Sequence, residues 1–368
     1  MKISWLLFPY LLFVCGTTVA QINETFSDSD FTNNPTWTGT PSAWIVNNKR
    51  QLQSNHQIEN STFYLSTANT MAIATQWEFF VRLHFNTSSV NYVDAWLTAS
   101  APDLSLAGTT GYFVRIGNTE DEISLYRKNA NGSVTRLIDG INGVTNKSDN
   151  VLKIKVIRTA NNQFILLRDV TGTGESYALE GSATDATYTT SAYFGFLVRQ
   201  STASFFGKHY WDDIVVQSFI PDVTPPAIRS VGVISANKLD ILFSEPISIS
   251  SEQVRNYSVS NSIGNPSIAQ RDSNNSALVH LSFATAFPNG ASNTITISGV
   301  QDLFGNTLNN GTSLFSFYIP QKLDVVINEI LFNPKPGAYD YVELYNRSNY
   351  LVDISQLSIA NRNSSGAI

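Results

Sequence analysis

Residues 152–167 read Leu-Lys-Ile-Lys-Val-Ile-Arg-Thr-Ala-Asn-Asn-Gln-Phe-Ile-Leu-Leu, and this stretch decides the fold class. The lysines at its start alternate with aliphatic residues, which is the period of two that a half-buried β-strand produces. Asn161 and Asn162 follow, and asparagine tolerates the positive φ of a tight turn. A second apolar strand begins at Gln163. The stretch therefore predicts a β-hairpin.

The same alternation recurs along the chain, whereas apolar spacing of three and four never persists long enough for a substantial helix. A second hairpin is predicted around Asn131-Gly132, between strands at 123–126 and 134–137. Further strands are predicted at 77–85, 93–98, 112–116, 193–198 and 211–216. About a dozen strands between Ile22 and Phe219 are too many for a simple immunoglobulin sandwich and fit a large two-sheet jelly roll.

A proline-rich linker at 221–227 interrupts the strands, because proline cannot donate to a β-ladder and restricts the residue before it. About seven short strands follow within 228–320, which is typical of an immunoglobulin-like sandwich. They are predicted at 228–234, 239–243, 257–259, 267–270, 278–283, 294–300 and 314–318.

Residues 22–220 resemble the concanavalin-like (laminin-G-like) jelly rolls of secreted Bacteroidetes proteins. The resemblance rests on the opening Asn-Pro-Thr-Trp-Thr-Gly at 34–39 and the closing Tyr-Trp-Asp-Asp-Ile-Val-Val at 210–216. Residues 228–320 resemble a bacterial Ig-like module of surface-layer and adhesive proteins, through Leu-Phe-Ser-Glu-Pro-Ile at 242–247 and Val-Gln-Asp-Leu-Phe-Gly-Asn at 300–306.

Residues 323–368 resemble the first strands of a lamin-tail domain, which is itself an Ig-like β-sandwich. The matching segments are Val-Val-Ile-Asn-Glu-Ile at 325–330, Tyr-Val-Glu-Leu-Tyr-Asn at 341–346 and Val-Asp-Ile-Ser at 352–355. Fewer than half of that family's strands are present, so the resemblance implies a truncated domain that continues beyond Ile368. The predicted fold is all-β: a jelly-roll sandwich, an Ig-like sandwich and an incomplete lamin-tail sandwich.

The N-terminus predicts export. Lys2 precedes an apolar run at 3–14, and Thr-Val-Ala at 18–20 supplies a cleavage site, so 1–20 is predicted to be a signal peptide. We expect a secreted or cell-surface protein with no transmembrane segment after cleavage. Cys15, the one cysteine, lies inside this segment, so the mature chain is expected to form no disulfide. A lipid-modified Cys15 is the alternative, although Val14 is a poor neighbour for that reaction.

No catalytic constellation is apparent in the sequence. The four histidines are scattered and form no metal-ligand motif; they are His56, His84, His209 and His280. The Glu-X-Asp-X-X-Glu motif of retaining glucanases does not occur. Glu120, Asp121 and Glu122 are contiguous, so their side chains would alternate between faces rather than face one another, and we predict a solvated turn there.

Calcium is the one cofactor that the sequence suggests. Jelly rolls often bind Ca²⁺ through oxygen ligands where the first and last strands meet. Asp28 and Asp30 lie near the start of the predicted jelly roll, and Asp212 and Asp213 near its end. Exposed rim positions are the alternative reading of these four carboxylates.

Tryptophans are the candidate sugar-stacking residues, because sugars dock their apolar faces on aromatic rings. Trp37, Trp44, Trp96 and Trp211 are available. A place in the core is the competing prediction for each of them, since aromatic residues supply much of the buried area of sandwiches.

These patterns favour a non-catalytic, modular surface protein for adhesion, matrix or glycan contact, with extracellular polysaccharide or cell-surface components as partners. The net charge of −6 without a basic run gives no support for nucleic-acid binding. The alternative is the accessory N-terminal region of an extracellular nuclease, phosphatase or glycan-active hydrolase whose catalytic domain lies downstream. A jelly roll that itself cleaves glycans is the third hypothesis.

Overall fold

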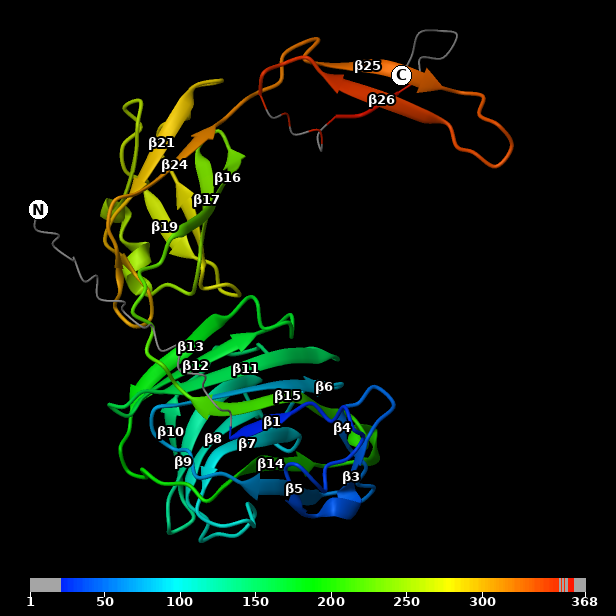
Figure 1. The fold of residues 1–368 in the computed structure, drawn as a ribbon, viewed down its shortest axis with the longest axis vertical. Helices are drawn as coiled ribbons and strands as arrows, with labels where there is room; N and C mark the ends of the chain where they lie inside the picture. Colours follow the sequence, from blue (N-terminus) through cyan, green and yellow to red (C-terminus); the bar gives the residue numbers. More distant parts are fainter. Residues whose placement is uncertain (1–20, 351, 353, 355–356, 361–368) are drawn as a thin grey trace, which may run out of the picture. The chain divides into compact units, whose positions relative to one another are not determined.

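The computed structural model describes residues 21–350, 352, 354 and 357–360. These residues form an all-β chain that divides into two compact units, Met1–Asp222 and Val223–Ile368 (Figure 1). The predicted signal peptide at 1–20 lies outside the described residues. Among those that are described, no helix has the length and apolar character needed to cross a membrane.

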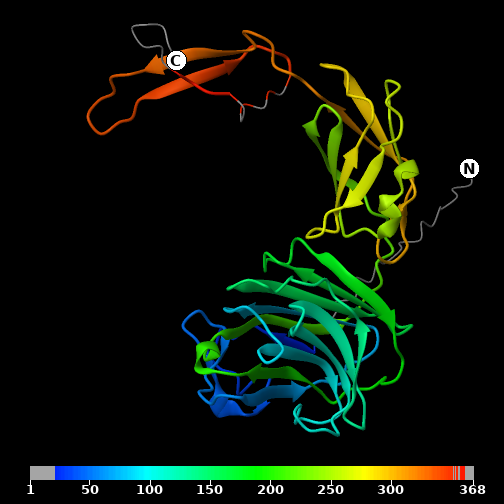
Figure 2. The same ribbon diagram turned by 180° about the vertical axis from the view of Figure 1, so that it is seen from behind.

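The first unit is a sandwich of two antiparallel sheets, as predicted for a jelly roll. Its strands are β1 (Ile22–Glu24), β2 (Thr38–Gly39), β3 (Trp44–Val46), β4 (Leu52–Ser54), β5 (Ser61–Ala68), β6 (Thr75–Leu83), β7 (Tyr92–Ala99), β8 (Gly111–Gly117), β9 (Glu122–Lys128), β10 (Val134–Ile138), β11 (Asn150–Arg158), β12 (Gln163–Asp169), β13 (Ala178–Thr184), β14 (Tyr193–Gln200) and β15 (His209–Ser218). The first sheet has the order β13-β12-β11-β6-β15-β4-β3, and β1 pairs with β15. The second sheet has the order β10-β9-β8-β7-β14-β5-β2. Figure 2 shows the two layers from behind.

The hairpin predicted for residues 152–167 is confirmed. β11 and β12 pair antiparallel, with Val156 opposite Leu166. Asn162 lies between them with φ of +62°, the left-handed conformation that asparagine tolerates. The second predicted hairpin is confirmed as β9 and β10. The prediction of about a dozen strands underestimated the number in the first unit. The strands β1 to β4 are only two or three residues long, which is too short to show alternation.

The main core of the first unit lies between the two sheets. β6 shows the alternation clearly, because Trp77, Phe79, Val81 and Leu83 are buried while the residues between them are partly exposed. Trp37, Trp44 and Trp211 join this core, where Trp44 and Trp211 meet edge to face at 5.1 Å between ring centroids. For these three tryptophans, the prediction of a core position is confirmed.

The second unit begins with an Ig-like sandwich. Its strands are β16 (Ile228–Ser235), β17 (Lys238–Phe243), β18 (Tyr257–Val259), β19 (Ile268–Arg271), β20 (Leu278–Ser282), β21 (Ser292–Ile297), β22 (Val300–Gln301), β23 (Thr307–Leu308) and β24 (Gly311–Ser316). Sheets of order β16-β17-β20-β19 and β18-β21-β24 enclose a core that includes Ile241, Phe243, Tyr257 and Ile295. The predicted seven strands correspond to β16–β21 and β24.

A final hairpin follows, made of β25 (Val325–Leu331) and β26 (Tyr341–Asn346). These are two of the segments on which the lamin-tail resemblance rests. Ile327 and Ile330 are about half exposed on this hairpin. Part of the third matching segment, at 352–355, lies outside the described residues, and the lamin-tail assignment stays a prediction.

His280 in the Ig-like sandwich gives a pH-dependent prediction. Its Nδ1 lies 2.7 Å from Asp240 Oδ1, and its Nε2 lies 3.2 Å from Asp272 Oδ2. The hydrogen bond to Asp240, reinforced by Asp272, raises the pKa of His280 above its ordinary value. The stabilisation from protonated His280 is therefore fully present below the unfolded pKa of about 6.5 and is lost as the pH rises through the folded pKa.

We expect the His280→Gln variant to lose more stability relative to wild type at pH 5.5 than at pH 9. The side chain is 43% exposed, so solvent screening limits the difference to less than about 1 kcal/mol. Urea unfolding followed by fluorescence at both pH values measures it. An equal loss at the two values would contradict the assigned role of the protonated ring.

Candidate functional site

The second sheet buries side chains on both of its faces. On β7, Val93, Ala95 and Leu97 point into the main core, so Trp96 lies on the opposite, outward face. A separate buried cluster covers this outward face and consists of Trp96, Ala99, Leu104, Phe113, Tyr126 and Leu197. Leu104 comes from the connection between β7 and β8, and is 1% exposed. That connection therefore folds over part of the sheet.

Three aromatic rings cross the outward face as a continuous row. Trp96 on β7 stacks on Phe113 on β8, with ring centroids 5.2 Å apart and planes at 29°. Phe113 stacks in turn on Tyr126 on β9, at 5.4 Å and 12°. The antiparallel register explains the row, because Trp96 faces Phe113 and Phe113 faces Tyr126 as cross-strand partners.

An ion pair lies beside this aromatic row. Arg115 Nε donates to Asp94 Oδ1 at 2.7 Å and Arg115 Nη2 donates to Asp94 Oδ2 at 2.8 Å, which is the bidentate geometry of a strong pair. The guanidinium also lies over the ring of Tyr92, at 4.1 Å from its centroid. Burial lowers the pKa of Arg115, but the charge of Asp94 outweighs this and raises it above its ordinary value. Arg115 is therefore a permanent cation here.

A cavity of about 250 Å³ opens between these groups. Its polar lining comes from strands across the sheet and from the covering connection, and comprises Thr62, Asp94, Ser105, Arg115 and Lys128, together with the indole of Trp96. Lys128 Nζ lies 5.5 Å from the Trp96 ring centroid and donates to the Leu106 carbonyl at 2.6 Å. The indole N–H of Trp96 has no hydrogen-bond partner within the described part of the chain. The indole N–H groups of Trp37, Trp44, Trp77 and Trp211 in the main core are likewise without a partner among the described residues, so this donor alone does not mark a ligand site.

This cavity was not predicted as a site, although Trp96 was one of the candidate stacking residues. The sequence signal was present, because Asp94 and Trp96 alternate on one strand, as do Phe113 and Arg115 on the next. The sequence alone does not show that these two strands pair and thereby bring the four residues together.

The four aspartates considered for calcium do not form a group of three ligands with one another or with another acid or histidine in the described residues. Asp28 Oδ1 accepts from the backbone N–H of Asp30, and Asp30 accepts from Thr32, as local turns do. The first and last strands do adjoin, since β1 pairs with β15. Calcium at these residues stays a prediction.

The late pair lies at a bulge of β15. Asp213 forms an ion pair with Lys153 at 3.0 Å and is largely exposed. Burial raises the pKa of Asp212 to about 6. The two adjacent carboxylates thus lie in different surroundings.

The histidines give no nucleophilic or metal site in the residues that the structure covers. His209 Nδ1 lies 2.9 Å from Ser54 Oγ, but the ring is fully buried. Its Nε2 has no hydrogen-bond partner among the described residues, so the pair lacks the orienting carboxylate of a triad. Burial lowers the pKa of His209 to about 3, so the ring is neutral. His84 is about half exposed and lies 3.2 Å from Asp149.

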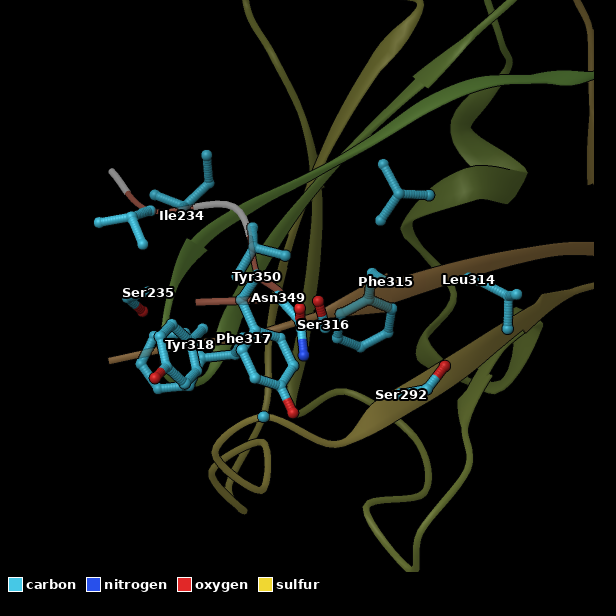
Figure 3. Close-up of a pocket in the computed structure, with 14 residues that line it drawn as sticks. Ile234, Ser235, Ser292, Leu314, Phe315, Ser316, Phe317, Tyr318, Asn349 and Tyr350 are labelled. Atoms are coloured by element: carbon cyan, nitrogen blue, oxygen red, sulfur yellow. The ribbon is translucent and has the colours of Figure 1, made fainter. Parts of the chain in front are cut away.

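A larger hollow of about 810 Å³ lies in the second unit (Figure 3). Residues of β16 and β24 line it, together with Tyr350, whose ring stacks on Tyr318 at 4.2 Å. Its lining is apolar, hydroxyl and amide, with no charged side chain. The smaller cavity in the first unit offers more groups that can bind a polar ligand, because it combines aromatic side chains, an ion pair and a lysine.

The fold defines a modular all-β protein, in which a jelly roll is followed by an immunoglobulin-like sandwich. Residues 220–318 match the family described as the bacterial Ig-like domain, which confirms the resemblance predicted for 228–320. No match is found among curated proteins.

Solved structures similar to this chain include a carbohydrate-binding module, CBM66 from Bacillus subtilis, at 11% identity and a TM-score of 0.36, covering 50% of this chain and 95% of that one. The exoplasmic domain of VIP36, bound to Ca²⁺ and Man3GlcNAc, is similar at 12% identity and a TM-score of 0.40, covering 54% and 89%. The N-terminal part of the bacterial S-layer protein SbsC is similar at 17% identity and a TM-score of 0.25, covering 29% of this chain and 26% of that one.

The Asp94–Arg115 pair gives a stability prediction. We expect Arg115→Met to lower the free energy of unfolding of the first unit by about 3 kcal/mol, because it leaves Asp94 buried without its counter-charge. The double variant Asp94→Leu/Arg115→Met should recover most of that loss. Urea denaturation measures both, with Lys49→Met at an exposed position as control. Equal losses in the single and double variants would show that the pair is not the cause.

Proposed function

We propose that the first unit is a non-catalytic glycan-binding module, and that the cavity on the outward face of its second sheet is the sugar site. The observation that carries this proposal is the convergence of an aromatic floor, a bidentate ion pair and a lysine ammonium group on one cavity. A sugar ring offers the matching chemistry, with apolar C–H faces and closely spaced hydroxyl groups.

The polar side chains that line the cavity can form hydrogen bonds with the neighbouring hydroxyl groups of a sugar. Asp94 is an acceptor and Arg115 and Lys128 are donors, and charged hydrogen bonds to hydroxyl groups are stronger than neutral ones. The Asp94 side chain is 6% exposed and that of Arg115 is 19% exposed, so bulk water competes weakly at this site.

The size of the cavity favours a short ligand segment. About 250 Å³ is below the roughly 300–1,000 Å³ of pockets that enclose drug-sized molecules. We infer that it holds one sugar ring, either a chain end or one residue of a polysaccharide. Contact with an extracellular polysaccharide by a secreted or surface-attached protein follows from this proposal together with the predicted export signal and the bacterial Ig-like domain.

The test is a glycan array followed by calorimetric titration of the full chain with the glycans that bind. We expect Lys128→Gln and Arg115→Lys each to weaken binding at least tenfold, because the first removes a charged donor and the second removes the planar fork. Lys147→Gln, exposed and away from the cavity lining, is the matched control and should bind as wild type does.

Thermal unfolding of each variant shows whether the fold is retained. Two results would overturn the proposal. One is wild-type protein that binds no glycan on the array, and the other is binding that survives both substitutions unchanged.

A further inference from the structure

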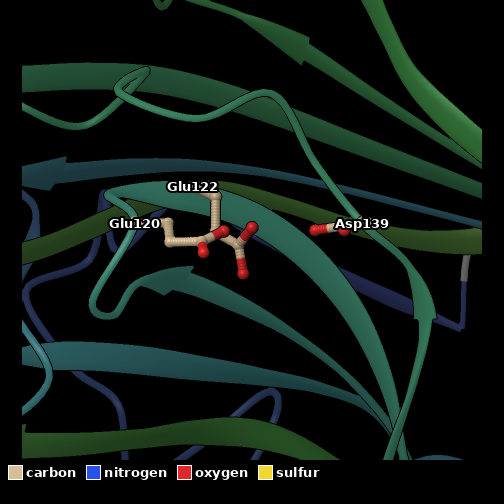
Figure 4. Close-up of side chains that lie close together, drawn as sticks. All are labelled: Glu120, Glu122 and Asp139. Carbon is tan, nitrogen blue, oxygen red and sulfur yellow. The ribbon is translucent and has the colours of Figure 1, made fainter.

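Three carboxylates converge at the edge of the second sheet, away from the cavity lining. Glu120 lies in the turn between β8 and β9, Glu122 begins β9, and Asp139 directly follows β10. One oxygen from each lies within 4.8 Å of one from each of the others. Figure 4 shows the three side chains turned toward a common point.

Glu122 is buried, which corrects the expectation of a solvated turn for this residue. The reason is the antiparallel pairing of β8 and β9, which sets Glu122 opposite Gly117 inside the sheet. Its side chain is 1% exposed. Oε1 accepts from the Tyr126 hydroxyl at 3.2 Å and from Arg136 Nη1 at 3.4 Å, whereas Oε2 has no partner in the described residues. A buried carboxylate oxygen without a donor is costly and points to a missing positive group.

The protein's own cation only partly balances the cluster. Arg136 Nη1 lies 2.7 Å from Asp139, 3.4 Å from Glu122 and 4.0 Å from Glu120. One positive charge thus faces three negative charges. The buried Glu180 also faces Glu122, but Glu180 is paired with Arg168 at 3.1 Å and adds no net charge.

The cluster is accessible from solvent on one side. The side chains of Glu120, Asp139 and Arg136 are 51%, 59% and 42% exposed. A cation can therefore enter past the two outer carboxylates and meet the buried oxygen of Glu122. Arg136 is long and partly exposed, so it can move into solvent as the cation enters.

We propose that Glu120, Glu122 and Asp139 bind a divalent cation of the calcium class, which displaces Arg136. Ca²⁺ prefers carboxylate oxygens, accepts monodentate and bidentate ligands and tolerates irregular geometry, as ligands from two loops and a strand require. The buried carboxylate of Glu122 supplies the inner contact. The site shares no residue with the lining of the proposed sugar cavity, and the proposal does not depend on that cavity.

Calorimetric titration of the EDTA-treated full chain with CaCl₂ tests the site. The wild type should bind Ca²⁺ and unfold at a higher temperature in its presence. The double variant Glu120→Gln/Asp139→Asn alters only exposed carboxylates, so it should fold, and it should bind at least tenfold more weakly. Arg136→Gln should bind Ca²⁺ several-fold more tightly than wild type, because the competing cation is gone.

Glu59→Gln/Glu175→Gln is the matched control, since it removes the same number of negative charges at exposed residues outside both candidate calcium groups and should leave affinity unchanged. The proposal is overturned by a wild type that shows neither binding heat nor thermal shift at millimolar CaCl₂. It is also overturned if Glu120→Gln/Asp139→Asn binds as wild type does, or if the control variant is the one that loses binding. Weaker Ca²⁺ binding by Arg136→Gln would contradict the displacement of Arg136.

Discussion

Burial of the second sheet on both faces is the constraint on which the first unit depends. One face closes the main core and the other carries the row Trp96, Phe113 and Tyr126. A charged residue on such a sheet cannot reach bulk water freely, so it needs a partner in the sheet itself. Asp94 and Arg115 satisfy each other in this way. The ion pair in the cavity lining is therefore a consequence of the same requirement.

Asp94 and the cluster around Glu122 differ in how completely neighbouring positive groups neutralise their negative charge. Asp94 has a bidentate partner, and the pair presents its remaining hydrogen-bonding capacity to the cavity. Glu122 shares one arginine with two other carboxylates and retains an oxygen without a donor. The first arrangement suits a neutral polar ligand such as a sugar, and the second suits a cation. Tyr126 connects the aromatic row to the carboxylate cluster, because its ring stacks on Phe113 and its hydroxyl donates to Glu122.

Local alternation made much of the fold predictable, and long-range pairing made the sites unpredictable. The β11–β12 hairpin, the strand around Trp77 and the seven strands of the Ig-like domain follow from patterns within single segments. The cavity depends on which strands are neighbours and in which register, and on a connection that folds back over the sheet. The burial of Glu122 was missed because three contiguous acids look like a turn, whereas the last of them is the first residue of a strand.

The most direct test of the central claim, that the outward face of the second sheet binds sugar, is the NMR signal of the Trp96 indole N–H. Titration of the full chain with neutral hexoses and uronic acids should shift this signal, because Trp96 lines the cavity in which the sugar would lie. The indole signals of Trp37, Trp44, Trp77 and Trp211, all within the main core, should stay in place. A Trp96 signal that does not move with a glycan the protein demonstrably binds would place the sugar elsewhere and contradict the claim.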